Sequence, residues 1–303
     1  MSSGWFIAYR FIGAVCLAPC LGCLIFLLIS YTTGGQWADA IRPRLARASR
    51  LLPWIWLALI PGVILEKFPI RHDTSSDAFL RIYLTHTGSI VRAFVYLVVF
   101  AGFAWFCRTS RETKSQTAVY HVRGARHPGF GPVGLIVLVF TLHLLAVDWI
   151  FALEPKWTST GFPLVWMAGQ AISGLSLTVF LALRADADPA RHGAAERALG
   201  LDWGNLLLTS TVFWVYVGFL QFLIIWSGDI PREISWYVHR AVAPWPYVLV
   251  ALAVVHLAIP FFALLSQRLK TSRRGLSAIA AILFCSQIVY TAWMILPSWP
   301  NLK

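Results

Sequence analysis

Eight apolar runs in the sequence are each about as long as a helix must be to cross a membrane. The hydrocarbon core of a bilayer is ~30 Å thick, so an α-helix crosses it with ~20 apolar residues. Backbone groups in lipid must satisfy their own hydrogen bonds, and a helix does so within one segment. We therefore expect an all-α polytopic membrane protein, with residues 1–303 forming a single integral membrane domain. The predicted spans are residues 11–31, 51–65, 90–107, 133–153, 162–183, 205–226, 245–267 and 276–296.

The composition excludes several other classes of protein. Hydrophobic residues make up 58% of the chain and charged residues 13%, against about 45–50% and ~25% in an average soluble domain. This excludes a cytosolic enzyme or a disordered chain. The five cysteines all lie within or at the ends of apolar runs, where they cannot form the disulfide framework of a secreted domain.

The net charge of +12 is best explained by membrane orientation, and we expect no nucleic-acid partner. Sixteen of the 25 basic residues fall in the loops opposite the two termini. Basic loops face the cytoplasm in membrane proteins, so both termini are predicted to be periplasmic. The most basic loop, residues 108–130, is interpreted as a solvated loop that contacts anionic lipid, or alternatively as a docking site for an acidic partner.

The segment before the second span carries a different pattern. Trp37, Ile41 and Leu45 alternate with arginines across residues 35–50. This spacing is typical of an amphipathic helix that lies on a lipid surface. The second span is the weakest prediction, because it is short and contains Pro53 and Pro61.

Four polar residues of the sixth span form the clearest functional pattern. At 100° per residue, Asp202, Asn205, Thr209 and Tyr216 lie on one narrow stripe. At 1.5 Å per residue the stripe extends about 21 Å from the cytoplasmic end. A polar stripe that enters from one side and stops suggests a half-channel for water or protons. In the alternative interpretation, Asp202 caps the helix and the other residues hydrogen-bond to neighbouring helices.

Four further ionisable groups could extend such a proton pathway. His143 and His256 lie near the middle of the fourth and seventh spans, and Asp148 and Glu154 lie near the outer end of the fourth. Ionisable groups in hydrocarbon are costly and are functional candidates. A neutral histidine can pass a proton between its ring nitrogens, although each could equally form a structural hydrogen bond. Asp148 is about 140° around the helix from His143, so a relay between them needs water or another helix.

No residue pattern assigns a catalytic, cofactor-binding or metal-binding role within this chain. Cys16, Cys20 and Cys23 resemble part of an iron–sulfur motif, but they lie inside a span and lack a fourth ligand. His143 and His256 are the only mid-depth histidine pair for a haem. The sequence contains no Walker loop, nucleotide fingerprint or zinc spacing.

Several motifs together resemble a known family. They are residues 34–37 (GGQW), 148–149 (DW), 153–160 (LEPKWTST), 202–207 (DWGNLL), 213–216 (FWVY), 221–226 (QFLIIW) and 231–233 (PRE). The combination resembles the ActF-type subunits of alternative complex III, a bacterial quinol:cytochrome c (or electron-carrier) oxidoreductase. These subunits are NrfD/polysulfide-reductase-like membrane proteins, and the resemblance extends from about residue 9 to residue 296.

The resemblance implies a subunit of the bacterial cytoplasmic membrane, built as two four-helix bundles and without a cofactor of its own. Quinol is the implied substrate of the complex, and haem c and iron–sulfur clusters are implied in other subunits. The implied partners are these peripheral subunits and a paralogous membrane subunit that binds quinol. The role implied here is assembly and proton conduction. Family members usually have ten spans, whereas this chain lacks the first and last, and residues 67–72 depart from the family's aromatic-rich segment.

Two other functions remain open from the sequence. A quinol-binding anchor would place His143, His256 and Tyr216 near the quinol ring. An independent transporter is disfavoured, because intramembrane charge is sparse and no inverted repeat with broken helices is evident.

Overall fold

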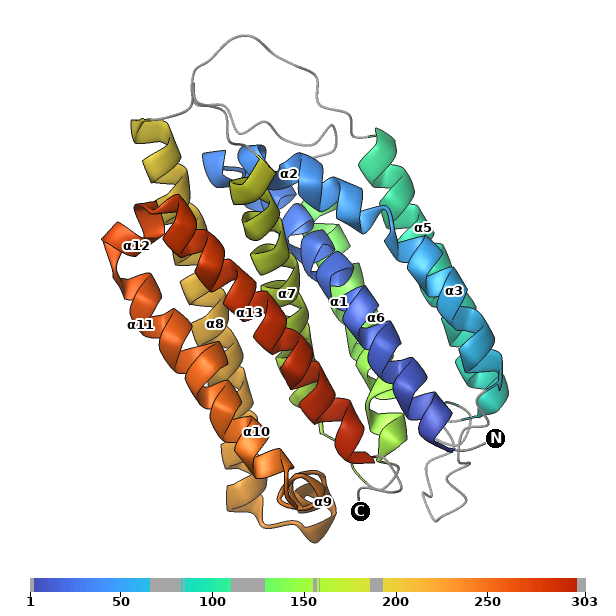
Figure 1. Ribbon diagram of the computed structural model, residues 1–303. Coiled ribbons are helices and arrows are strands. Elements are labelled where there is room, and N and C mark those ends of the chain that lie inside the picture. The colour runs from blue at the N-terminus through green and yellow to red at the C-terminus, as the bar shows by residue number, and fades with distance from the viewer. Residues whose placement is uncertain are drawn as a thin grey trace.

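The computed structural model in Figure 1 describes residues 3–65, 83, 85–109, 129–154, 157, 159–185 and 193–298. The described residues are almost entirely helical and include no strand. They contain 8 helical segments long and apolar enough to cross a membrane, which confirms the predicted all-α class. These segments are Gly4–Thr33, Gln36–Leu65, His86–Arg108, Phe130–Leu153, Phe162–Ala185, Ala194–Gly228, Trp245–Leu265 and Arg273–Ser298.

Most helical segments extend beyond the predicted spans, and several of them are divided into shorter helices. They are α1 (Ser3–Thr33), α2 (Gln36–Ser49), α3 (Leu52–Leu65), α5 (His86–Thr109), α6 (Phe130–Trp149), η1 (Phe151–Leu153), α7 (Phe162–Ala185), α8 (Ala194–Gly228), α9 (Pro231–Arg240), α10 (Trp245–Leu252), η3 (Ala253–Ala258), α11 (Ile259–Leu265), α12 (Gln267–Thr271), α13 (Arg273–Ile295) and η4 (Leu296–Ser298). The predicted second span is only the α3 part of a longer segment that begins with α2. The predicted seventh span is divided into α10, the π-helical turn η3 and α11.

The two ends of the described chain lie at the same end of the molecule. In Figure 1, the start of α1, the end of α13 and α9 all lie in the lower part of the view, whereas α2 and α12 lie in the upper part. We call these the α9 end and the α12 end. An even number of spans requires this arrangement of the termini.

Helices α1 and α7 cross with their backbones in direct contact. A Cβ atom on Gly22 would lie 1.9 Å from the carbonyl oxygen of Gln170, and one on Gly174 would lie 2.2 Å from the backbone nitrogen of Cys23. Only glycine leaves room for this approach, which is a common way to bring membrane helices together. Gly169, which is also on α7, packs against Gln287 of α13, so α7 is closely packed on two sides.

The amphipathic pattern of residues 35–50 does produce a helix, α2, but its apolar face is not left for lipid. Ile41 and Leu45 are fully buried in a cluster with Phe26 and Leu27 of α1. Arg42, on the buried side, forms an ion pair with Asp39 at 2.6 Å. The helix therefore covers one end of the helix bundle.

Four arginines bind the carboxyl ends of four different helices. The last carbonyls of a helix have no partner within it and form the negative end of its dipole, so a cation there is stabilising. Arg10 donates to Trp149 O at 2.6 Å on α6, Arg50 to Cys107 O at 2.6 Å on α5, Arg273 to Leu183 O at 2.6 Å on α7, and Arg240 to Trp293 O at 3.3 Å on α13. Each contact joins residues far apart in the chain and fixes the position of one helix end.

Candidate functional site

A buried ion pair joins α5 to the end of α6. The Arg92 guanidinium donates from Nε to Asp148 Oδ2 at 2.9 Å and from Nη2 to Asp148 Oδ1 at 2.7 Å. The hydroxyl of Tyr96 donates to Asp148 Oδ2 at 2.7 Å. Both charged side chains are nearly buried, with 13% and 11% of their surfaces exposed. The ion pair is therefore well shielded from water, and loss of either side chain would leave the other charge without its partner.

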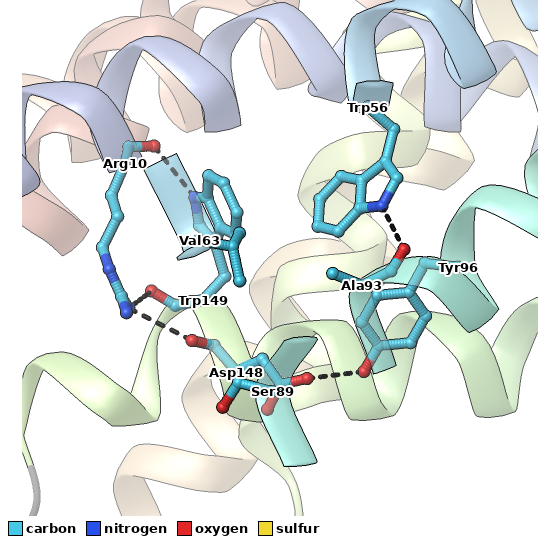
Figure 2. Close-up of a pocket in the computed structure, with 8 residues that line it drawn as sticks. All are labelled: Arg10, Trp56, Val63, Ser89, Ala93, Tyr96, Asp148 and Trp149. Carbon is cyan, nitrogen blue, oxygen red and sulfur yellow. Dashed lines mark hydrogen bonds between the residues drawn. The ribbon is translucent and has the colours of Figure 1, made fainter. Parts of the chain in front are cut away.

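A small pocket lies beside this ion pair at the α9 end (Figure 2). Its cavity measures about 20 Å³, which is room for about one water molecule. Its walls are held by tryptophans: Trp56 donates from its indole nitrogen to Ala93 O at 2.7 Å, and Trp149 donates to Arg10 O at 2.9 Å. The hydrogen bonds fix the positions of the aromatic side chains around the ion pair.

A second polar cluster also lies at the α9 end of the molecule. Glu154, 6% exposed, accepts from His239 Nδ1 at 2.9 Å and from the Ser298 hydroxyl at 3.3 Å. Trp157 stacks on Trp236 with ring centroids 4.4 Å apart. These contacts connect the segment after α6 to α9 and η4.

Arg240 packs against Trp236 of the same cluster. Its guanidinium carbon lies 3.2 Å from the centre of the Trp236 ring. Burial lowers the pKa of Arg240 to about 9, so the side chain remains a cation at neutral pH. A cation over an aromatic face is attracted by the ring electrons, and this contact anchors α9.

His256 lies in a fully enclosed site inside the molecule. Its Nδ1 is 2.6 Å from Ser286 Oγ, and that hydroxyl donates to Ile282 O at 2.6 Å. Because the serine proton is used there, Nδ1 of His256 is the donor and Nε2 has the free lone pair. Nε2 is buried and has no hydrogen-bond partner among the described residues. His256 lies in the π-helical turn η3, and such turns are frequent at functional sites.

Three buried glutamines also have side-chain atoms without a hydrogen-bond partner in the part of the chain that the structure describes. They are Gln170 of α7, Gln221 of α8 and Gln287 of α13. An unsatisfied buried polar group costs ~1–3 kcal/mol, and internal water is the usual remedy. The Gln287 amide packs against Gly169 of α7. We therefore expect internal water between α7 and α13.

The four residues of the predicted stripe lie on an exposed face of α8. Asp202, Asn205 and Thr209 are all exposed, and Tyr216 is 57% exposed. The chain alone therefore does not enclose the stripe as a half-channel. Asn205 accepts from Lys270 Nζ at 2.6 Å, which is the interhelical bond of the alternative interpretation. Asp202 does not cap the helix, because α8 already begins at Ala194.

The predicted pathway residues are not brought together. Asp148 belongs to the Arg92 ion pair, Glu154 to the α9 cluster and His256 to the enclosed site, whereas His143 is half-buried on α6 outside these groups. Among the described residues, no group of three or more His, Cys, Asp or Glu side chains is placed to hold a metal ion.

A comparison with models of known protein families finds no match, and a comparison with curated proteins finds no significant similarity.

Proposed function

We propose that the chain is an integral membrane subunit of a bacterial quinol:electron-carrier oxidoreductase of the alternative complex III type. Its role is assembly and proton conduction, without a redox group of its own. The main support is that two motifs behind the resemblance, residues 148–160 and 231–233, belong to segments that meet at the α9 end. There they are joined through Glu154 and His239 and through Trp157 and Trp236. An end of the molecule that is fixed by aromatic and polar contacts can serve as a docking surface for peripheral subunits.

On this proposal, the α9 end faces the periplasm of a bacterial inner membrane. The peripheral subunits with haem c and iron–sulfur clusters dock there, a paralogous membrane subunit binds quinol, and the spans form the family's two four-helix bundles. A reporter enzyme fused after Lys303 should therefore show periplasmic activity. A cytoplasmic signal would contradict the proposed orientation.

Deletion of the gene tests the function itself. Membranes from the deletion strain should lose quinol-dependent reduction of the electron carrier, and the wild-type chain should restore it. Unchanged activity in the deletion strain would exclude the proposed role.

The proton-conducting part of the proposal is supported by the site around His256. An enclosed imidazole with a free lone pair can accept and release protons. His256→Gln removes the titratable ring from this site. We expect it to lower the proton-to-electron ratio in vesicles while the complex still assembles.

Thr209→Val on the exposed stripe is the matched control, because it removes a hydroxyl at nearly constant volume. Its proton-to-electron ratio should equal that of the wild type. A normal ratio in His256→Gln would contradict conduction through the enclosed site. A reduced ratio in Thr209→Val alone would instead support conduction along the stripe.

The pocket beside Asp148 gives no support to the alternative of a quinol-binding anchor. Its cavity of about 20 Å³ has room for about one water, which is too little for a quinol ring, and His143, His256 and Tyr216 do not line it. The Tyr96 hydroxyl is also already bonded to Asp148.

A further inference from the structure

The junction of α8 and α12 presents a buried cation at the edge of an exposed helix face. Lys270 is only 7% exposed, and its side chain packs against Gly204, where a Cβ would lie 2.6 Å from the lysine Cγ. Its Nζ donates to Asn205 Oδ1 at 2.6 Å. The glycine therefore admits the lysine stem, and the ammonium group lies next to the exposed stripe of α8.

The charge of Lys270 is not balanced within the described part of the chain. None of the ion pairs there includes it, and its hydrogen-bond partner is a neutral amide. An ammonium has three donors, so two remain for another group. Of the two acids on α8, Glu196 pairs with Arg273 at 3.7 Å, and Asp202 is exposed. Lys270 therefore brings to this junction a positive charge that no carboxylate of the described residues pairs.

The exposed face of α8 changes from polar to apolar along its length. Asn205 and Thr209 lie at the Lys270 end, and Val212, Tyr216 and Phe219 continue the same face at helical spacing. These three apolar or aromatic side chains are 41%, 57% and 60% exposed. A cation and polar groups followed by an apolar strip match the form of a phospholipid, with its headgroup at one end and its acyl chains along the other.

We propose that this junction binds one anionic phospholipid. The lipid phosphate receives hydrogen bonds from Lys270 and from the hydroxyl of Thr209, and the acyl chains lie along α8. Basic sites between membrane helices are typical binding sites for anionic headgroups. This inference is independent of the proposed respiratory function, because it rests only on Lys270 and the exposed face of α8.

Native mass spectrometry of the full chain, in whatever assembly it purifies, tests the proposal. Phosphatidylglycerol and phosphatidylcholine are titrated separately. We expect preferential retention of phosphatidylglycerol, and Lys270→Gln should weaken its binding about fivefold, the factor expected for one basic residue near a membrane surface. Arg47→Gln removes an exposed cation on α2 and serves as the matched control, with unchanged binding. If Lys270→Gln does not fold, Thr209→Val removes the second phosphate contact and should also weaken phosphatidylglycerol binding.

Three outcomes would overturn the proposal. The first is equal retention of the two lipids by the wild-type chain. The second is an equal loss of phosphatidylglycerol in the junction variant and in Arg47→Gln. The third is displacement by inorganic phosphate as efficient as displacement by lipid, which would identify a phosphate site without a role for the acyl chains.

Discussion

Replacing Asp148 by leucine should destabilise the folded chain by about 3–5 kcal/mol, the usual cost of removing one partner from a buried ion pair. The substitution leaves the Arg92 guanidinium, whose side chain is 13% exposed, without its carboxylate. It also removes the acceptor of the Tyr96 hydroxyl. The free energy of unfolding in mixed micelles of detergent and denaturing surfactant measures the effect.

The double variant Arg92→Met/Asp148→Leu separates the ion pair from simple side-chain volume. Replacing both members of a buried pair by apolar residues is often close to neutral, so this variant should recover most of the lost stability. Asp202→Leu is the control for loss of an exposed carboxylate and should change stability by less than ~0.5 kcal/mol. If Asp148→Leu were as mild as this control, the ion pair would not hold α5 to α6.

Gly174→Val should prevent α1 and α7 from packing. A Cβ at this position would lie 2.2 Å from the backbone nitrogen of Cys23, and neither backbone can move away without separating the helices. Overpacking costs typically ~1–3 kcal/mol, and contact with backbone should bring the cost to the top of that range or beyond it. We expect little or no monodisperse protein on size-exclusion chromatography.

Gly102→Val provides a matched control, because a Cβ at Gly102 has no atom within 4 Å in the described structure. This variant should purify like the wild type. Normal yield and stability of Gly174→Val would show that the α1–α7 crossing is looser than described.

The fold class could be predicted from the sequence because hydropathy alone locates membrane helices. The eight predicted spans each overlap a helical segment in the structure, although α8 begins at Ala194, well before the predicted start at residue 205. Helical periodicity places the four residues of the stripe on one face of α8, and all four are exposed. Periodicity cannot determine whether such a face points toward other helices or away from them, since that depends on long-range packing.

The buried arginines were missed for the same reason. Arg10 and Arg240 lie outside the predicted spans, and the carbonyls that they bind, on Trp149 and Trp293, are distant in sequence. A clearer signal existed for Arg92, which lies near the outer end of one predicted span, as Asp148 does in another. Opposite charges at the same membrane depth suggest a pair, and this pattern could have identified the network beside the pocket.

Affinity purification from native membranes in mild detergent tests the central claim most directly. With a tag on this chain, mass spectrometry should identify a haem c subunit, an iron–sulfur subunit and a paralogous membrane subunit in stoichiometric amounts, and the eluate should oxidise quinol. A chain that purifies alone, or with none of these subunits, would contradict its assignment to a quinol-oxidising complex.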